Sequence, residues 1–317
     1  MHGDDLISVR VTHIDTLDRD IRFFHLVSNT QEPLPAFEPG AHVDVHFPND
    51  IIRSYSLCGD GQCTEEYGLA VKLDEETRGG SLYLHTHVYE GSILRISPPR
   101  SHFRIDEQAS EHVFIAGGIG ITPFFSMMHE LDRRGAAWRL YFSVRPAESL
   151  PFSDDLARWG DRVSVIDTTK AGRMDFGAIL DRHGKAATYY CCGPNDFIAS
   201  LEEVAEAKGF PPVLSEKFKA DLSTWSVGLE TFTVRLVRSG VEVTVGPGER
   251  IIDALEQEGV FIPYACREGT CGACEMRVIS GRPVHNDVIL SEAQRREGDV
   301  VMICCAGSET EVLEIDY

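Results

Sequence analysis

Three cysteines near the C-terminus lie within nine residues, and a fourth follows at a distance. They form the segment Cys266-Arg-Glu-Gly-Thr-Cys271-Gly-Ala-Cys274, which is followed by Cys304 after 29 intervening residues. Four cysteines with this C-x4-C-x2-C spacing are typical of a 2Fe–2S cluster, in which four thiolates hold two irons. Gly269 and Gly272 suit the tight loop required, because glycine accepts unusual backbone angles and lets amides approach the sulfurs. The chain should therefore contain a domain that brings this loop and Cys304 together.

Two alternatives concern the metal and the fourth ligand. A structural zinc site usually pairs two short Cys-x2-4-Cys segments. Here three cysteines lie in one segment and a single cysteine follows at a distance, so the pattern favours an iron–sulfur cluster over zinc. Cys304 and Cys305 are adjacent, and either could complete the site. The segment resembles plant-type ferredoxins, in which a similar gap separates the third and fourth ligands. That resemblance selects Cys304 and leaves Cys305 as a small buried neighbour.

The composition restricts the possible partners and the compartment. A formal charge of −20 over 317 residues argues against binding to nucleic acid or to anionic membrane surfaces. The five remaining cysteines form no disulfide framework, and their odd number fits a reducing compartment. The N-terminal residues have no basic start and no apolar run, and no stretch is apolar enough for a membrane span. We therefore predict a cytoplasmic protein of two or three domains.

Residues 1–106 are predicted to form a small antiparallel β-barrel. Short alternating segments are separated by proline and glycine turns, and they cover residues 8–12, 21–27, 42–47, 67–73 and 92–96. Four histidines of this region, His42, His46, His85 and His87, lie in segments predicted to be strands or loops, and we interpret them as structural or surface residues. The barrel is thus expected to provide a scaffold without metal ligands.

A candidate flavin site lies within this barrel. Arg53-Ser54-Tyr55-Ser56 could supply a phosphate partner, an aromatic side chain along the flavin and a hydroxyl for the isoalloxazine, and Gly79-Gly80-Ser81 could supply amides and a hydroxyl to the same phosphate. Ordinary sheet surface is the alternative for either segment alone. Val71 and Lys72 are included in the candidate set, and Ser56 is also a candidate catalytic residue.

The two segments resemble ferredoxin reductase-like flavoproteins, which share an Arg-x-Tyr-Ser motif. The Gly-Gly-Ser segment is similar to the phosphate loop of the branch that binds FMN. No counterpart of the additional sequence that holds the adenosine of FAD is evident between Arg78 and Pro98. The resemblance therefore implies FMN rather than FAD.

Residues 107–218 alternate between strand and helix patterns, which predicts a parallel sheet covered by helices. Gly117, Gly118 and Gly120 follow the first strand, with Thr122 as the expected N-cap and Pro123 as the first helical residue. A helix N-terminus behind glycines can bind a pyrophosphate, although a purely structural turn is the alternative. Cys192-Gly193-Pro194 ends the last strand, at the same carboxyl edge where ligands of such sheets bind.

This pair of segments resembles the pyridine-nucleotide domain of ferredoxin reductases. The resemblance places Cys192 near the nicotinamide, although an inert buried thiol is an alternative, and it lays Phe218 against the flavin. Thr122, Cys192 and Phe218 are therefore candidate catalytic residues. Ser143 and Arg145 follow the second strand, where the 2′-phosphate of NADPH would lie, but the resemblance to the FMN branch favours NADH.

Residues 219–230 lack periodicity and are predicted to be a linker to a third domain at residues 231–317. Strand patterns at residues 232–237, 241–245, 276–279, 300–304 and 312–315, with a helix at 251–258, follow the ferredoxin order and predict an α+β (β-grasp) fold. This segment contains fifteen acidic and eight basic residues. A basic docking surface on its electron acceptor is therefore expected.

Taken together, the chain resembles the phthalate dioxygenase reductase family from about Leu6 to Tyr317. The resemblance implies the reductase component of a two-component Rieske-type oxygenase, which passes electrons from NADH through FMN and a 2Fe–2S cluster. A stand-alone reductase of another acceptor and a redox-sensing protein remain alternatives. One departure concerns the residues after the fourth ligand, where Cys305-Ala-Gly-Ser308 replaces the Ser-Arg-Ala type of sequence and puts the partner specificity in doubt.

Overall fold

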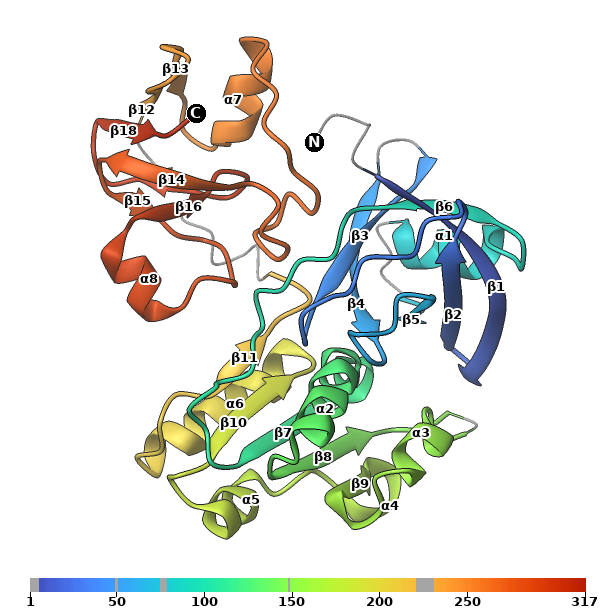
Figure 1. Ribbon diagram of the computed structural model, residues 1–317. Coiled ribbons are helices and arrows are strands. Elements are labelled where there is room, and N and C mark those ends of the chain that lie inside the picture. The colour runs from blue at the N-terminus through green and yellow to red at the C-terminus, as the bar shows by residue number, and fades with distance from the viewer. Residues whose placement is uncertain (1–5, 49–50, 75–78, 148, 221–230) are drawn as a thin grey trace. The chain divides into compact units, whose positions relative to one another are not determined.

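The computed structural model describes residues 6–48, 51–74, 79–147, 149–220 and 231–317 (Figure 1). The chain divides into two compact units, Asp5–Glu216 and Lys217–Tyr317, and the first contains both the barrel and the parallel sheet. Most of the predicted linker, from residue 221 to 230, lies outside the described residues. The domain boundaries at residues 106 and 218 stay predictions.

The barrel is closed and antiparallel, as predicted. Its strands follow one another around the barrel in the order β1 (Ile7–Asp18), β2 (Ile21–Ser28), β5 (Glu66–Lys72), β4 (Ile52–Cys58), β3 (His42–His46) and β6 (Ile93–Ile96). Alternate apolar side chains of these strands form the interior, including Val11, Leu26, Val45 and Leu69. Closure gives each of these strands a neighbour on both sides, although among the described residues β4 pairs with β5 only at Leu57 and Cys58.

One helix of the barrel was not expected. The α1 helix (Gly80–His87) lies between β5 and β6 and buries Leu84 in the barrel core. The prediction that His85 and His87 lie in strands or loops was therefore wrong. The apolar residues of α1 do not keep to one helical face, so its sequence lacks the periodicity that identifies an amphipathic helix.

The parallel sheet has the predicted α/β architecture. Its strands run in the order β11 (Leu214–Glu216), β10 (Thr188–Cys192), β7 (His112–Gly117), β8 (Trp138–Val144) and β9 (Val163–Asp167), and every neighbouring pair is parallel. The helices between them are α2 (Thr122–Arg134), α3 (Ser153–Ala157), α4 (Thr168–Ala171), α5 (Phe176–His183) and α6 (Asn195–Ala207). One face packs on α2 and α3, and the other packs on α5 and α6, as Figure 1 shows.

Barrel and sheet share a continuous core within the first unit. Cys58, Ala70 and Phe103 from the barrel side belong to the same buried cluster as Phe124 and Tyr190. Across this boundary, the Gly40 N–H donates to Ser126 Oγ (2.9 Å), and the Asp106 N–H donates to Tyr190 Oη (2.8 Å). The two halves are therefore fixed relative to each other.

The C-terminal unit has the predicted α+β fold. Its mixed sheet has the order β13 (Glu242–Val245), β12 (Phe232–Leu236), β18 (Val312–Ile315), β14 (Glu275–Ser280) and β16 (Val300–Met302). The α7 helix (Ile251–Gln257) packs its apolar residues onto this sheet, and β15 (Pro283–Val284) pairs with β17 (Gly307–Ser308). The α8 helix (Glu292–Glu297) was missed, although Ser291 and Gln294 form a capping box that the sequence could have revealed.

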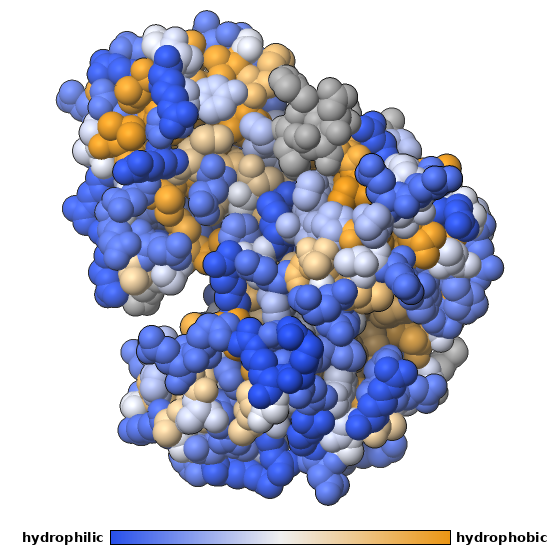
Figure 2. Space-filling model, in the orientation of Figure 1, coloured by the Kyte–Doolittle hydropathy of each residue, from blue (hydrophilic) through white to orange (hydrophobic). Residues whose placement is uncertain are grey.

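Hydrophilic residues predominate on the face drawn in Figure 2, in keeping with the large formal charge. Among the described residues, no helix combines the length and the apolar character needed to cross a membrane. The Gly307 and Ser308 positions, which depart from the expected family pattern, form the short strand β17. The residues that differ from the family pattern therefore lie in a strand that pairs with β15.

Candidate functional site

The cysteine loop between α7 and β14 is shaped around the Cys266 sulfur. The Glu268 and Thr270 N–H groups both donate to Cys266 Sγ at 3.3 Å, and the Cys266 N–H donates to Cys271 Sγ at 3.5 Å. Gly269 and Gly272 have φ of 68° and 72°, which is the left-handed region that glycine adopts without strain. Amides that point at sulfur stabilise thiolate character, so the loop suits an iron–sulfur cluster.

Cys304 lies beside this loop. A hydrogen bond with Cys271 lowers the pKa of Cys266, but interaction with Cys304 and burial outweigh it, and the net pKa is raised. Cys271, Cys274 and Cys304 are all buried. The structure thus brings together the predicted ligands, and the choice of Cys304 rather than Cys305 stays a prediction.

The described residues include no group of three or more His, Cys, Asp or Glu side chains arranged around a single metal ion. A 2Fe–2S cluster does not require such a group, because it divides its four thiolates between two irons.

A neighbouring segment holds both parts of the cysteine site. The Val288 N–H donates to the Gly269 carbonyl (3.0 Å), and Asn286 Nδ2 donates to the Cys305 carbonyl (2.7 Å). Asp287 is buried, and its Oδ1 accepts from the Leu290 N–H at 2.8 Å. Burial raises the pKa of Asp287, but interaction with His285 and the Leu290 hydrogen bond lower it, so the net pKa lies below its ordinary value. Sequence reasoning missed these residues, which have no recognisable spacing.

The candidate flavin strand is β4. It pairs with β3 along its length, from Ser56 opposite His42 to Ile52 opposite His46, but in the described residues it pairs with β5 only at Leu57 and Cys58. The two strands therefore diverge beside Tyr55. Arg53 and Tyr55 thus pair with β3 on one side and have no paired β5 residue among those described on the other.

The start of α1 lies against these two side chains. A Cβ atom added to Gly80 would be 2.5 Å from Arg53 Cγ and 3.1 Å from Tyr55 Oη. Gly79 has φ of 102°, and Ser81 Oγ accepts from the Asp74 N–H at 3.2 Å. The Gly79-Gly80-Ser81 segment, predicted to be a loop, is thus the N-terminus of a helix, which adds partial positive charge beside Arg53.

Other members of the flavin set have different surroundings. Ser54 Oγ donates to the buried carboxylate of Asp44 at 2.6 Å. The Val71 side chain is buried in the barrel core, and its carbonyl lies 2.9 Å from His85 Nε2. Lys72 pairs with Asp20 at 3.4 Å. Ser56 is 7% exposed and lies two residues before Cys58, which contacts the start of α2.

The glycine turn after β7 differs from the prediction in one respect. A 3₁₀ helix, η2 (Gly118–Ile121), runs directly into α2, so Ile121 is the N-cap and Thr122 is the first helical residue. Thr122 Oγ1 donates backward to the Ile119 carbonyl at 3.0 Å. The prediction that Thr122 is the N-cap was wrong, because continuous helical geometry keeps its hydroxyl away from the free amides. Pro123 consequently occupies the second helical position.

The glycine turn and the Cys192 segment are in contact. A Cβ atom on Gly120 would lie 2.4 Å from the Cys192 carbonyl carbon and oxygen, and one on Gly193 would lie 3.0 Å from Gly117 Cα. Cys192 is opposite Ala116 in the parallel register, so both segments leave the sheet at the same edge. Pro194 is the N-cap of α6. The predicted convergence of the two motifs is confirmed.

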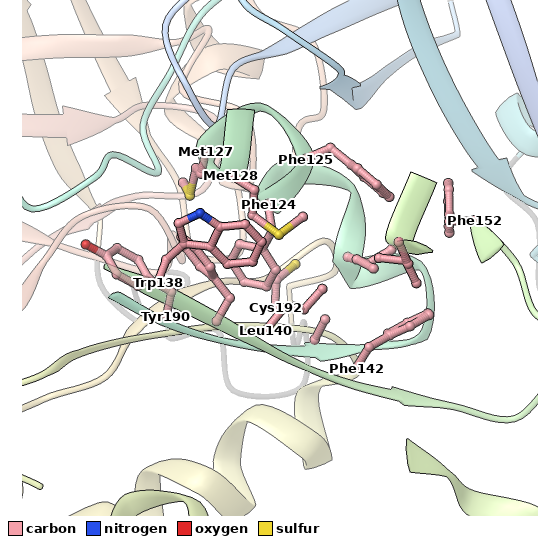
Figure 3. Close-up of a cluster of buried hydrophobic side chains, with 14 of the residues drawn as sticks. Phe124, Phe125, Met127, Met128, Trp138, Leu140, Phe142, Phe152, Tyr190 and Cys192 are labelled. Atoms are coloured by element: carbon pink, nitrogen blue, oxygen red, sulfur yellow. The ribbon is translucent and has the colours of Figure 1, made fainter. Parts of the chain in front are cut away.

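Cys192 points into the sheet's hydrophobic core rather than into solvent. It is fully buried among Phe124, Leu140 and Tyr190, as Figure 3 shows. Burial, followed by interaction with Glu216, raises the pKa of Cys192 well above its ordinary value. This environment favours the protonated thiol and the alternative of an inert side chain.

Glu216 is a residue that sequence reasoning missed. It is opposite Cys192 in the register of β10 and β11, and its Oε2 atom is inaccessible and lacks a hydrogen-bond partner among the described residues. Burial raises the pKa of Glu216 to about 8. No spacing in the sequence distinguishes Glu216 from the other acidic residues, although it lies two positions before the candidate Phe218.

The remaining nucleotide candidates occupy two places. Ser143 lies on β8 opposite Gly117, and Arg145 follows that strand and is exposed. Phe218 belongs to the C-terminal unit and is 37% exposed. Its predicted contact with the flavin stays a prediction.

The flavin strand and the glycine turn meet within the first unit. Cys58, two residues beyond Ser56, donates from its thiol to the Thr122 carbonyl at 3.8 Å. The end of β4 and the start of α2 are in extensive contact. A ligand along Tyr55 and Ser56 and a ligand on the glycine turn would therefore approach each other at this boundary.

Comparison with known proteins agrees with this architecture. Residues 234–308 match the model of the 2Fe-2S iron-sulfur cluster binding domain. The chain is 38% identical to phenoxybenzoate dioxygenase subunit beta of Ectopseudomonas oleovorans, over 98% of this chain and 97% of that protein. The solved structure of phthalate dioxygenase reductase is 32% identical, with a TM-score of 0.70, and the match covers 99% of this chain and 98% of that one.

A longer protein is also similar. The structure of an intact type IV self-sufficient cytochrome P450 monooxygenase is 32% identical, with a TM-score of 0.90. The match covers 98% of this chain but only 41% of that one. The chain thus spans about two fifths of the length of that protein.

Proposed function

The chain belongs to the phthalate dioxygenase reductase family, and we propose that it is the reductase component of a two-component oxygenase. Electrons pass from NADH through FMN and a 2Fe–2S cluster to a Rieske-type oxygenase partner. The observation that carries the proposal is the contact between the end of the flavin strand and the start of α2, in a chain that also contains a cluster-binding domain.

The need for three redox groups follows from their chemistry. Bound FMN would supply the chemistry that links NADH, a two-electron donor, to a 2Fe–2S cluster, which takes up one electron at a time. The protein supplies binding and orientation. Because Gly80 lacks a side chain, Arg53 and Tyr55 lie directly against the start of α1. The guanidinium and the α1 N-terminus would together bind the FMN phosphate.

The nucleotide is assigned to the edge formed by Gly117, Gly120 and Gly193. The amides at the start of α2 would bind the pyrophosphate. Because Gly120 has no side chain, the glycine turn packs directly against the Cys192 backbone. Glu216, next to Cys192, is a carboxyl that can hold a proton near neutral pH. Its place at this edge supports a positioning role for the nicotinamide end.

An anaerobic NADH titration of the purified protein, with iron and extracted flavin quantified, tests the proposal. Uptake of about three electrons per chain, with bleaching of both flavin and iron–sulfur absorbance, is expected. Bleaching of flavin alone, or the absence of iron, would reduce the assignment to a simple flavin reductase.

A haem monooxygenase is the second candidate acceptor. The similar region of the self-sufficient cytochrome P450 monooxygenase favours it. Reduction of a purified Rieske oxygenase and of a purified P450 by this protein, compared at equal concentrations, separates the two acceptors. Faster reduction of the P450 would contradict the Rieske assignment while leaving the reductase function intact.

We also propose a cytoplasmic location. None of the nine cysteines, all of which lie in the described residues, forms a disulfide, and this fits a reducing compartment. Fractionation of producing cells into cytoplasmic, periplasmic and membrane fractions tests this location. Recovery with either of the latter two would contradict it.

A further inference from the structure

Five thiols, rather than four, meet at the cysteine site. Cys305 is buried, and a Cβ atom added to Gly269 would lie 2.7 Å from its Sγ. Gly269 is at the centre of the loop that carries Cys266 and Cys271. The Cys305 sulfur therefore touches the cluster loop itself, at a position where any side chain on residue 269 would displace it.

Cys305 is also close to two other candidate ligands. The Cys305 side chain interacts with Cys304 through a hydrogen bond and lies near Cys274. Its thiol has only a weak alternative contact, to the Met302 carbonyl at 3.5 Å. The Cys305 sulfur thus lies near two candidate ligands and against the loop that carries two others.

The backbone presents both neighbouring cysteines to the loop. The Cys305 and Ala306 N–H groups both donate to the Met302 carbonyl at 3.1 Å, which folds residues 302–306 into a tight turn. Asn286 Nδ2 holds the Cys305 carbonyl at 2.7 Å. The two adjacent cysteines of one turn therefore both lie beside the loop that carries Cys266 and Cys271.

We propose that Cys305 is a reserve ligand, which replaces Cys304 at the cluster when the Cys304 thiol is removed. The inference rests on the proposed 2Fe–2S function. In the exchange, the Cys305 thiol releases its proton to water and forms one Fe–S bond in place of the Cys304 bond, so no electrons are gained or lost. Removal of Cys271 or Cys274 is not expected to be compensated in this way, because only Cys304 shares the turn of residues 302–306 with Cys305.

The test uses four full-length variants, Cys304→Ala, Cys305→Ala, the double variant, and Cys274→Ala as a matched ligand deletion. Iron and acid-labile sulfide per chain are measured, with the EPR spectrum of the reduced protein, and flavin content reports folding of the first unit. We expect each of the Cys304→Ala and Cys305→Ala variants to retain iron within about twofold of the wild type. The double variant and Cys274→Ala should lose it by roughly tenfold or more.

Three outcomes would overturn the inference. Cys304→Ala could lose iron as Cys274→Ala does, Cys305→Ala alone could lose it, or the double variant could retain it. Absence of iron from the wild type would instead overturn the proposed function itself.

A second pair of variants tests ligation by Cys305 if Cys304→Ala does not fold. Cys304→Ser can bind through oxygen, so its EPR spectrum is compared with and without Cys305→Ala. A spectrum that changes on the second substitution supports ligation by Cys305. An unchanged spectrum contradicts it.

Discussion

The two units of the chain build their sites from very different lengths of sequence. Three candidate cluster ligands, Cys266, Cys271 and Cys274, lie within nine residues, in a loop that is shaped by its own amides and glycines. The flavin and nucleotide candidates are drawn from Arg53 to Glu216 and meet only because β4 packs on α2 and β10 lies beside β7. We therefore expect the cluster site, which is local in sequence, to be lost when one ligand is removed. The flavin and nucleotide sites, which are assembled from distant segments, should instead be sensitive to changes in backbone packing.

The strongest test of this contrast is Cys271→Ala. We expect loss of the cluster and at least a ~100-fold decrease in electron transfer to the oxygenase, because three thiolates cannot complete the two-iron site. Reduction of ferricyanide directly from the flavin should stay within about twofold, since the first unit is unaffected. Iron analysis and the two assays measure this, with exposed Cys63→Ala as the control. Equal loss of both activities would contradict the separation of the sites.

The converse test is Gly120→Val in the assembled site. Its side chain would meet the Cys192 backbone, which cannot give way as a flexible side chain can, so we expect a loss of about 3 kcal/mol in stability and weaker NADH binding. Gly118→Ala is the matched control, because it meets nothing within 4 Å and bears only the strain of φ 56°. Thermal unfolding and NADH titration measure both. Iron content should not change, and a loss of iron would contradict the independence of the units.

Glu216→Gln tests burial at the same edge. The pKa of Glu216 is raised from 4.5 to about 8, so the unfolded chain ionises first and the wild type loses stability as pH rises from 4.5 to 8. The stability of Glu216→Gln should not show this decrease, because glutamine does not ionise. Allowing for the partial exposure of the side chain, its advantage at pH 9 should be on the order of 2 kcal/mol and should vanish below pH 4.5. Thermal unfolding across this range is the measurement, and exposed Glu203→Gln should show no such trend. An equal effect of both variants would contradict the assignment.

The smallest expected effect concerns Gly80→Ala. The added methyl would meet Arg53 Cγ and approach Tyr55 Oη, and these side chains can shift, so FMN binding should weaken by about 3- to 10-fold. Gly91→Ala, in the same barrel, meets nothing within 4 Å and should leave FMN affinity unchanged despite its strained φ of 90°. Fluorescence titration of the flavin-free protein compares them. A larger effect of Gly91→Ala would argue against a flavin beside α1.

Much of the fold followed from pattern and spacing. The barrel strands, the parallel sheet, the hairpin of β12 and β13 and the cysteine loop were all predicted, because period-two burial and turn residues are local properties. The α1 and α8 helices were missed. In α1 the apolar residues follow no helical stripe, and Leu84 is held by the barrel rather than by helix propensity.

The sites show the same limit at the level of single residues. The convergence of Gly120 on Cys192 was predicted from strand order, because carboxyl ends of parallel strands share one edge. The prediction that Thr122 caps the helix was wrong, since η2 continues directly into α2. Glu216 could not be selected from other acidic residues, because its importance comes from its register with Cys192 and from burial.

The sequence by itself determined the cluster spacing, the order of the three predicted domains and the presence of a glycine turn after a buried strand, since each is encoded within a short stretch. The tertiary structure decided which distant groups touch. Register and packing place Glu216 beside Cys192, α1 against Arg53, and the Cys305 sulfur against Gly269. Such contacts depend on how closely separate backbones approach, and no periodicity within one segment records that distance.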